Sequence, residues 1–313
     1  MKIFLSTVLA AASVQTSVAC DFCAIYTATE AHDGKGFYGG LAEQFTHLGT
    51  LQSEGRVVPN VAAQHLDSVI SQVFAGYNFN ERFGAQLNVP VIYRSFKRPE
   101  GFATDRGSES GVGDVSLIGK FTAYRKQTED DTVLLNLLGG IKFPTGNTRR
   151  ITEEFNEVEV PGAPVSGIHG HDLTLGSGSF DGLVGVNVYA RYQRMFVGAG
   201  VQYSIRSEGN FGYQFANDLT WSGGPGVLLV LRENFTLSLQ ANVSGETKST
   251  DTFQGVRAGD TGITSVYLGP QFTATWRDRF HAELGVDVPV SIANTALQAV
   301  TDYRIHAAVT VRF

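Results

Sequence analysis

The sequence predicts an all-β fold, a transmembrane antiparallel up-and-down β-barrel of about twelve strands. Three observations predict it: an N-terminus typical of secreted proteins, repeated stretches with a two-residue period, and the pattern of the last strand. Along that strand apolar and polar residues alternate up to a C-terminal aromatic residue, Phe313. Its apolar face carries Tyr303, Ile305, Ala307, Val309 and Val311. Its polar face carries Arg304, His306, Thr310 and Arg312.

The first residues are typical of a cleaved secretory signal peptide. Lys2 supplies a positive charge, Ile3 to Val14 form an apolar stretch, and Ser17-Val18-Ala19 form a small-residue cleavage site. The apolar stretch is shorter than the roughly 18 residues that a membrane-spanning helix needs. We therefore expect three parts: a signal peptide over 1–19, a periplasmic N-terminal segment over 20–35, and the barrel over 36–313.

Composition agrees with this class. No later stretch of the sequence is apolar for long enough to cross a membrane as a helix, and a closed barrel is the other way to satisfy backbone groups in lipid. Glycine accounts for 36 of 313 residues, above the average of roughly 7%. The formal net charge of -6 argues against a nucleic-acid partner, which requires a basic surface.

Segments with a two-residue period recur along the whole barrel region, each bounded by turn residues. We predict twelve strands, at Gly36 to Thr46, Leu66 to Phe79, Phe83 to Lys97, Asp114 to Arg125, Thr132 to Phe143, Ser179 to Tyr192, Met195 to Arg206, Phe215 to Leu231, Asn234 to Gly245, Ile263 to Arg277, Phe280 to Ile292 and Val300 to Phe313. The glycine-rich run at 223–226 indicates a bulge or a kink in the eighth of these strands.

The connections alternate between short and long. Short turns are predicted at 80–82, 126–131, 193–194, 232–233 and 278–279. Longer polar loops are predicted at 48–65, 98–113, 144–178, 207–214, 246–262 and 293–299. This asymmetry matches outer-membrane barrels, whose short turns face the periplasm. An even number of strands then places both termini in the periplasm.

Aromatic residues cluster beside the short turns. They are Phe79, Phe83, Tyr124, Tyr192, Phe196, Phe235, Trp276, Phe280 and Phe313. On a barrel they would form an aromatic girdle at the periplasmic interface. A soluble all-β sandwich also carries aromatic residues at strand ends, but it does not explain the loop asymmetry and the terminal strand together.

If the apolar face contacts lipid, the other face lines the lumen. The charged and titratable candidates there are Arg94, Lys120, Lys142, Arg206, His281, Glu283, Asp287, Arg304 and His306. Glu283 and Asp287 could simply neutralise Arg304 or His306 on the neighbouring strand. Alternatively, opposed acidic and basic rows form a constriction that selects small polar or zwitterionic solutes.

The two cysteines, Cys20 and Cys23, lie at the expected mature N-terminus. In an oxidising compartment a local disulfide or a redox contact is the first expectation. Lipidation of Cys20 and metal binding are the alternatives. Ser17 disfavours lipidation, and two cysteine ligands alone are few for a metal site.

The longest loop contains His169 and His171, which are two residues apart and could bind one metal ion together. Surface loops often carry such pairs of histidines without binding a metal. Common hydrolase, metalloprotease and nucleotide-binding motifs are missing from the sequence. A barrel phospholipase would need a serine and histidine pair on the lipid side, whereas His281 and His306 face inward by the same alternation. We therefore expect no enzyme activity and no cofactor.

Three segments resemble a family of bacterial outer-membrane barrels described as transporters of the phenol meta-cleavage pathway. They are Gly111 to Leu117, Gly139 to Asn147, and Leu175 to Asp181. Asn147 stands where the family has aspartate, and the resemblance runs from Gly111 to the C-terminus, leaving the cysteines outside it. It implies a barrel and, if it extends to cargo, apolar or aromatic solutes.

The first functional hypothesis is an outer-membrane channel or transporter for small molecules. The alternative is a scaffold that does not transport and that docks a redox or metal-handling partner through Cys20 and Cys23. The expected partners are outer-membrane lipid and lipopolysaccharide, a small-molecule solute, and the barrel-insertion machinery, which would recognise Phe313.

Overall fold

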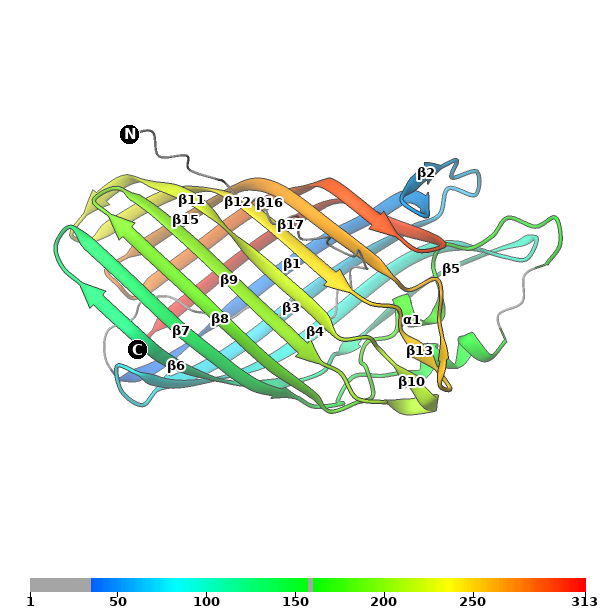
Figure 1. The fold of residues 1–313 in the computed structure, drawn as a ribbon, viewed down its shortest axis with the longest axis horizontal. Coiled ribbons are helices and arrows are strands. Elements are labelled where there is room, and N and C mark those ends of the chain that lie inside the picture. The colour runs from blue at the N-terminus through cyan, green and yellow to red at the C-terminus, as the bar shows by residue number, and fades with distance from the viewer. Residues whose placement is uncertain (1–34, 157–159) are drawn as a thin grey trace, which may run out of the picture.

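The computed structural model describes residues 35–156 and 160–313, which form a closed antiparallel β-barrel (Figure 1). Twelve strands make up the wall. Their bounds are β1 Gly36–Ser53, β3 His65–Asn78, β4 Phe83–Glu100, β6 Ser116–Gln127, β7 Asp131–Lys142, β8 Asp181–Tyr192, β9 Met195–Ile205, β11 Asp218–Arg232, β12 Phe235–Lys248, β15 Ile263–Trp276, β16 Phe280–Asn294 and β17 Leu297–Arg312.

The first and last wall strands pair with each other and close the barrel. Their register runs from Tyr38 opposite Arg312 to Ser53 opposite Leu297, with irregularities on both sides of Leu48. β1 begins and β17 ends at the end of the barrel that carries the short turns (Figure 1). Closure leaves no unpaired strand edge in the wall, which is the condition for crossing lipid with strands.

The twelve predicted strands are confirmed, as is the pattern of short turns. Each predicted segment overlaps one wall strand, and five short connections join consecutive strands at one end. β11 continues through the glycine-rich run in regular pairing with β9. Its pairing with β12 skips Gly224 and Pro225, and the register shifts between Leu228 and Val230. The period of two succeeds as a predictor because lipid and the lumen select opposite side-chain chemistry on the two faces of each strand.

Three predicted loops are wrong. β1 continues to Ser53 and pairs with the short β2, Arg56–Val58. β4 continues to Glu100 and forms a hairpin with β5, Ala103–Val112. Only residues 295–296 separate β16 from β17. Apolar and polar residues do not alternate strictly in these extensions, so the two-residue period does not mark them. Side chains also join them, as Arg98 and Asp105 do at 3.0 Å between β4 and β5.

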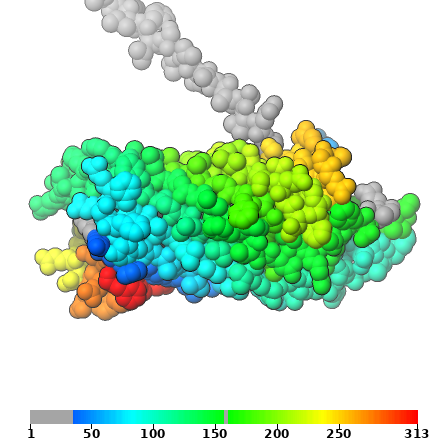
Figure 2. Space-filling model, turned by 90° about the horizontal axis from the view of Figure 1, so that it is seen from below, coloured from blue at the N-terminus to red at the C-terminus, as the bar shows by residue number. Residues whose placement is uncertain are grey.

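The outer surface of the wall is apolar. Exposed large apolar residues follow the outward face of the strands, and in space-filling view the wall is continuous (Figure 2). The aromatic residues beside the short turns are exposed as predicted, with one exception, Phe196, whose ring lies on Gly226 at the inner face. In the described part of the chain, no helix has the length and apolarity that a membrane crossing requires.

The segment between β7 and β8 folds into the end of the barrel opposite the short turns; we call its described residues, 143–156 and 160–180, the plug loop. It carries the short helices η2, Arg149–Phe155, and α1, Gly170–Leu173. Ile168 and Leu173 pack against the inward side chains of Leu66 and Phe96. Leu175 packs against Ile70 and Ile92. The prediction of a polar surface loop here is wrong, because its few apolar residues are the ones that fill the mouth.

Neighbouring connections cover the plug loop. The helix η3, Asn210–Gly212, precedes a small sheet made of β10, Tyr213–Gln214, β13, Thr252–Phe253, and β14, Val256–Arg257. Tyr213 and Phe215 pack with Ile151 of η2, and Phe253 packs against this cluster. A backbone hydrogen bond of 2.7 Å, donated by Ala299 N to Gly167 O, also ties the plug loop to β17. Several connections packed together therefore cover the end of the lumen opposite the short turns.

We predict that Leu173→Ala loosens the plug loop. Leu173 is fully buried, and removing a buried leucine side chain costs about 2–5 kcal/mol, so cleavage of the loop by added protease should accelerate roughly tenfold or more. The matched control is Leu284→Ala, the same change at an outward position that is 53% exposed. Equal cleavage rates in the two variants would contradict the packing described above.

Candidate functional site

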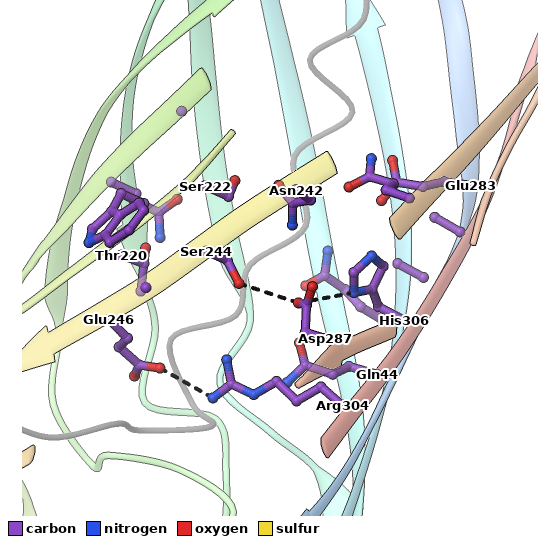
Figure 3. A pocket seen from close by; sticks show the side chains of 18 of the residues that line it. Gln44, Thr220, Ser222, Asn242, Ser244, Glu246, Glu283, Asp287, Arg304 and His306 are labelled. Atoms are coloured by element: carbon purple, nitrogen blue, oxygen red, sulfur yellow. Dashed lines mark hydrogen bonds and ion pairs between the residues drawn. The ribbon is translucent and has the colours of Figure 1, made fainter. Parts of the chain in front are cut away.

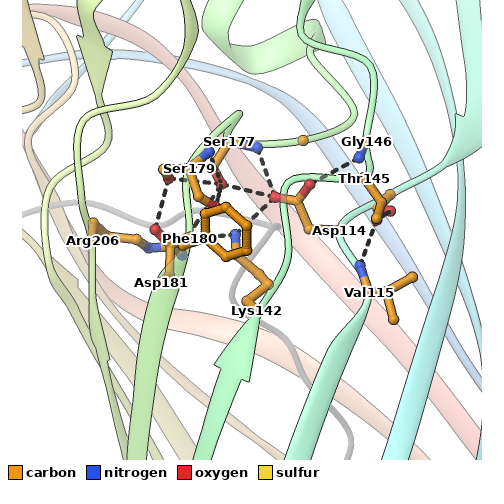
Figure 4. A network of polar contacts seen from close by, with 12 residues as sticks. Asp114, Val115, Lys142, Thr145, Gly146, Ser177, Ser179, Phe180, Asp181 and Arg206 are labelled. Carbon is orange, nitrogen blue, oxygen red and sulfur yellow. Dashed lines mark hydrogen bonds and ion pairs between the residues drawn. The ribbon is translucent and has the colours of Figure 1, made fainter.

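Five charged side chains form a buried network at the strand ends opposite the short turns. Figure 4 labels four of them, Asp114, Lys142, Asp181 and Arg206, and the fifth is Asp218. Lys142 Nζ lies 3.1 Å from Asp114 Oδ2 and 2.9 Å from Asp181 Oδ2. Arg206 reaches Asp181 at 2.8 Å and Asp218 at 2.7 Å. None of the five is more than 7% exposed. Charges this deeply buried are costly unless they are paired, and each of these five has an ionic partner within 3.1 Å.

The same network holds both ends of the plug loop. Asp114 accepts hydrogen bonds from Gly146 N at 2.9 Å and from the backbone and hydroxyl of Ser177 at 2.7 and 2.8 Å. Ser179 Oγ donates to Asp181 at 2.7 Å. Thr145 Oγ1 donates to Gly113 O at 2.7 Å. The loop is thus tied to the strands on either side of it.

The three segments that carry the family resemblance meet in this network. Gly146 and Gly176 touch each other there: a Cβ on Gly176 would lie 2.7 Å from Gly146 Cα. Lys142 and Arg206, predicted as lumen-lining charges, belong to this anchor. The sequence analysis did not single out the three aspartates as ionic partners of Lys142 and Arg206, since nothing in a strand pattern pairs residues on different hairpins.

A cavity of about 290 Å³ lies inside the barrel (Figure 3). Most of its lining residues carry polar or charged side chains, although apolar atoms form the larger part of the lining surface. The amide and hydroxyl side chains that line it are Gln44, Gln72, Asn187, Gln202, Thr220, Ser222, Asn242, Ser244 and Gln271. Apolar lining comes from residues such as Ile70, Leu138 and Trp221. Four of the predicted lumen residues also line it: Glu283, Asp287, Arg304 and His306.

The charged groups of the cavity pair differently from the sequence expectation. Arg304 reaches across to β12, where its Nη2 lies 3.5 Å from Glu246 Oε2, and its guanidinium stacks 4.2 Å from the ring centre of Tyr267. His306 Nδ1 lies 3.6 Å from Asp287 Oδ2. Asp287 therefore pairs with His306, one of the two partners expected from the sequence. Within the described residues, Glu283 has no hydrogen bond or ion pair.

Two glycines make room for large side chains in the cavity wall. The Trp221 ring lies over Gly245 on β12, and the His306 ring lies over Gly285 on β16. A Cβ at either glycine would overlap the ring. Each ring therefore lies flat against the neighbouring strand, which leaves the space in front of it open.

The other predicted lumen residues lie outside this cavity. Arg94 and His281 are buried at 2% exposure, and His281 Nδ1 lies 3.1 Å from Thr275 Oγ1. Lys120 is half-buried on β6, with Leu138 of β7 opposite it. Cys20 and Cys23 lie outside the described residues, so the expectations for them stay predictions.

His169 and His171 lie in the plug loop with their rings stacked 5.6 Å apart. His171 Nδ1 is 3.0 Å from Glu154 Oε1, and His169 is 3.6 Å from Asp260. Burial opposes a charge on His171, yet Asp172 and Glu154 raise its pKa to about 10. Among the described residues no group of three or more histidines, cysteines or carboxylates is placed to hold a metal ion.

We predict that Lys142→Met destabilises the barrel end and releases the plug loop. The change leaves Asp114 and Asp181 buried without their lysine, and breaking a buried pair in this way costs about 3–5 kcal/mol. Urea unfolding in detergent measures it. Lys126→Met is the matched control, since Lys126 pairs with Asp131 at the surface and its loss should cost about 1 kcal/mol or less. Similar midpoints for the two variants would refute an anchoring role.

The His171 and Glu154 pair predicts a pH dependence. The pKa of His171 rises from 6.5 to about 10 on folding, so its stabilisation is complete below about pH 6.5 and is lost as the pH rises through about 10. We expect the wild type to resist proteolysis of the plug loop better than His171→Gln near pH 6, and the difference to vanish above pH 10. A difference that stays constant up to pH 11 would contradict this.

No protein-family model and no curated protein matches the chain, so the pathway family suggested by the resemblance has no support from sequence comparison. Solved structures do match. An outer-membrane channel from Pseudomonas putida F1 superposes with a TM-score of 0.67 at 14% identity, covering 92% of this chain and 100% of that one. The β domain of the Bordetella autotransporter BrkA gives a TM-score of 0.47 at 11% identity, covering 90% and 100%. The first match shows that this chain has the fold of a bacterial outer-membrane barrel.

Proposed function

We propose that this protein is an outer-membrane channel for small polar solutes, closed at its outer end by the plug loop. The cavity of about 290 Å³ inside the barrel is the observation that carries the proposal. A barrel that served only as a scaffold would have no need for open space lined by hydrogen-bonding groups at this depth. The volume suits a small solute.

The membrane location rests on the outer surface and the chain ends. The wall presents an apolar outward face with aromatic residues beside the short turns, as outer-membrane barrels do. The predicted signal peptide and the C-terminal Phe313 agree with that location. Both β1 and β17 reach the short-turn end, which in this proposal faces the periplasm.

The hydrogen-bonding side chains of the wall support polar solutes as cargo. Amide side chains offer both donors and acceptors, so they can replace the water that a sugar-sized or amino-acid-sized molecule loses on entering. Apolar or aromatic cargo, which the family resemblance implies, would leave most of these groups without hydrogen bonds. Trp221 is the large aromatic side chain of the wall that would suit such cargo.

Passage requires the plug loop to shift. Leu175 of the loop packs on Ile70, which lines the cavity, so the loop bounds the cavity on its outer side. On the other side of the loop, Ile168 and His169 line a second cavity of about 1570 Å³. The loop therefore separates an outer vestibule from the inner cavity, and its contacts set how readily solutes pass.

Solute flux tests the proposal. Proteoliposomes containing the wild type should swell in small sugars or amino acids, and those containing Leu173→Ala should swell faster because the loop is less firmly packed. Leu284→Ala provides the control for an equal change on the outward face. Absence of swelling in all three proteins would reject the channel and favour the scaffold hypothesis.

A further inference from the structure

The charged groups that line the cavity are unequal in number. Carboxylates come from Glu246 on β12 and from Glu283 and Asp287 on β16, whereas positive charge comes from Arg304 and, when protonated, His306 on β17. Glu43 also borders the cavity, but its carboxylate accepts a hydrogen bond of 2.7 Å from Ser71 Oγ on the neighbouring strand. Negative groups therefore outnumber positive ones around the cavity.

The positive groups are already engaged. Arg304 lies between Glu246 and the ring of Tyr267, and His306 lies beside Asp287. Asp287 also accepts a hydrogen bond from Ser244 Oγ at 3.3 Å. These contacts account for two of the three carboxylates of the inner wall, as the dashed lines in Figure 3 show. Neither of the two cationic residues that line the cavity therefore pairs with the third carboxylate.

The third carboxylate, Glu283, points into the cavity without a partner in the described part of the chain. Its neighbours across the strands are Thr273 and Ala308, and Ala308 cannot donate a side-chain hydrogen bond. An unpaired carboxylate away from bulk water is costly, and the cost is recovered when a cation binds. Lys120, an inward cation on β6, lies outside the lining of the cavity.

We infer that the cavity is a binding site for solutes that carry a cationic amine, with Glu283 as the group that receives it. The inference rests on the proposed channel function and narrows its solute class to organic cations and zwitterions. The surrounding amide and hydroxyl groups hold the neutral or acceptor part of the solute. Small anions are disfavoured because they meet uncompensated carboxylate first.

Bilayer recordings test this with the full chain. In a KCl gradient the wild type and the Leu173→Ala variant should be cation-selective, and ethanolammonium should permeate better than acetate. Glu283→Gln, which keeps the shape of the side chain, should lower the ratio of cation to anion permeability several-fold, and Glu283→Asp should restore part of it. Glu233→Gln removes the same charge from an exposed turn and should have no effect.

The outcomes separate the two proposals. Conductance with anion selectivity, or with selectivity that Glu283→Gln leaves unchanged, would overturn the amine site and leave the channel in place. Absence of conductance in every protein, including Leu173→Ala, would overturn the channel and the site together. Heat-modified mobility of each variant on gels verifies that its barrel has folded.

Discussion

Every backbone group in a lipid-embedded wall needs a hydrogen-bond partner, and this requirement shapes the whole molecule. Pairing of β1 with β17 meets it by closing the sheet. Closure then forces one face of every strand toward lipid and the other toward a confined interior. The outward face became apolar, and the inward face had to hold polar and charged groups in a narrow space where each needs a partner.

The interior meets that second demand in two ways. At the strand ends opposite the short turns, Lys142 and Arg206 are shared among three aspartates, and the plug loop donates further hydrogen bonds to two of them, Asp114 and Asp181. Deeper in the barrel, Arg304 spans from β17 to β12 to reach Glu246. The first set of contacts anchors the plug loop. The second set borders the cavity, in which Glu283 is the carboxylate without an ionic partner among the described residues.

The plug loop covers one end of the barrel while the cavity inside the barrel stays open, and both features depend on which residues face inward. Apolar residues of the plug loop bury the inward Leu66, Phe96, Ile70 and Ile92, which would otherwise face water. Below them, rings that lie flat on glycines keep the wall thin. A barrel of this size has a narrow interior. Both the plug loop and the cavity therefore depend on the glycines that let a ring or a second backbone segment pack closely against them.

The sequence by itself determined the strands, their facing and the closure, since lipid on one side and the lumen on the other impose a period of two on each strand. It also located Glu283, Asp287, Arg304 and His306 on the inner face by the same alternation. Only the tertiary structure decided which charges pair and where the long loop lies. The Arg304 contact with Glu246 and the packing of Leu173 on Phe96 join residues on distant strands, and no local period encodes contacts across the lumen.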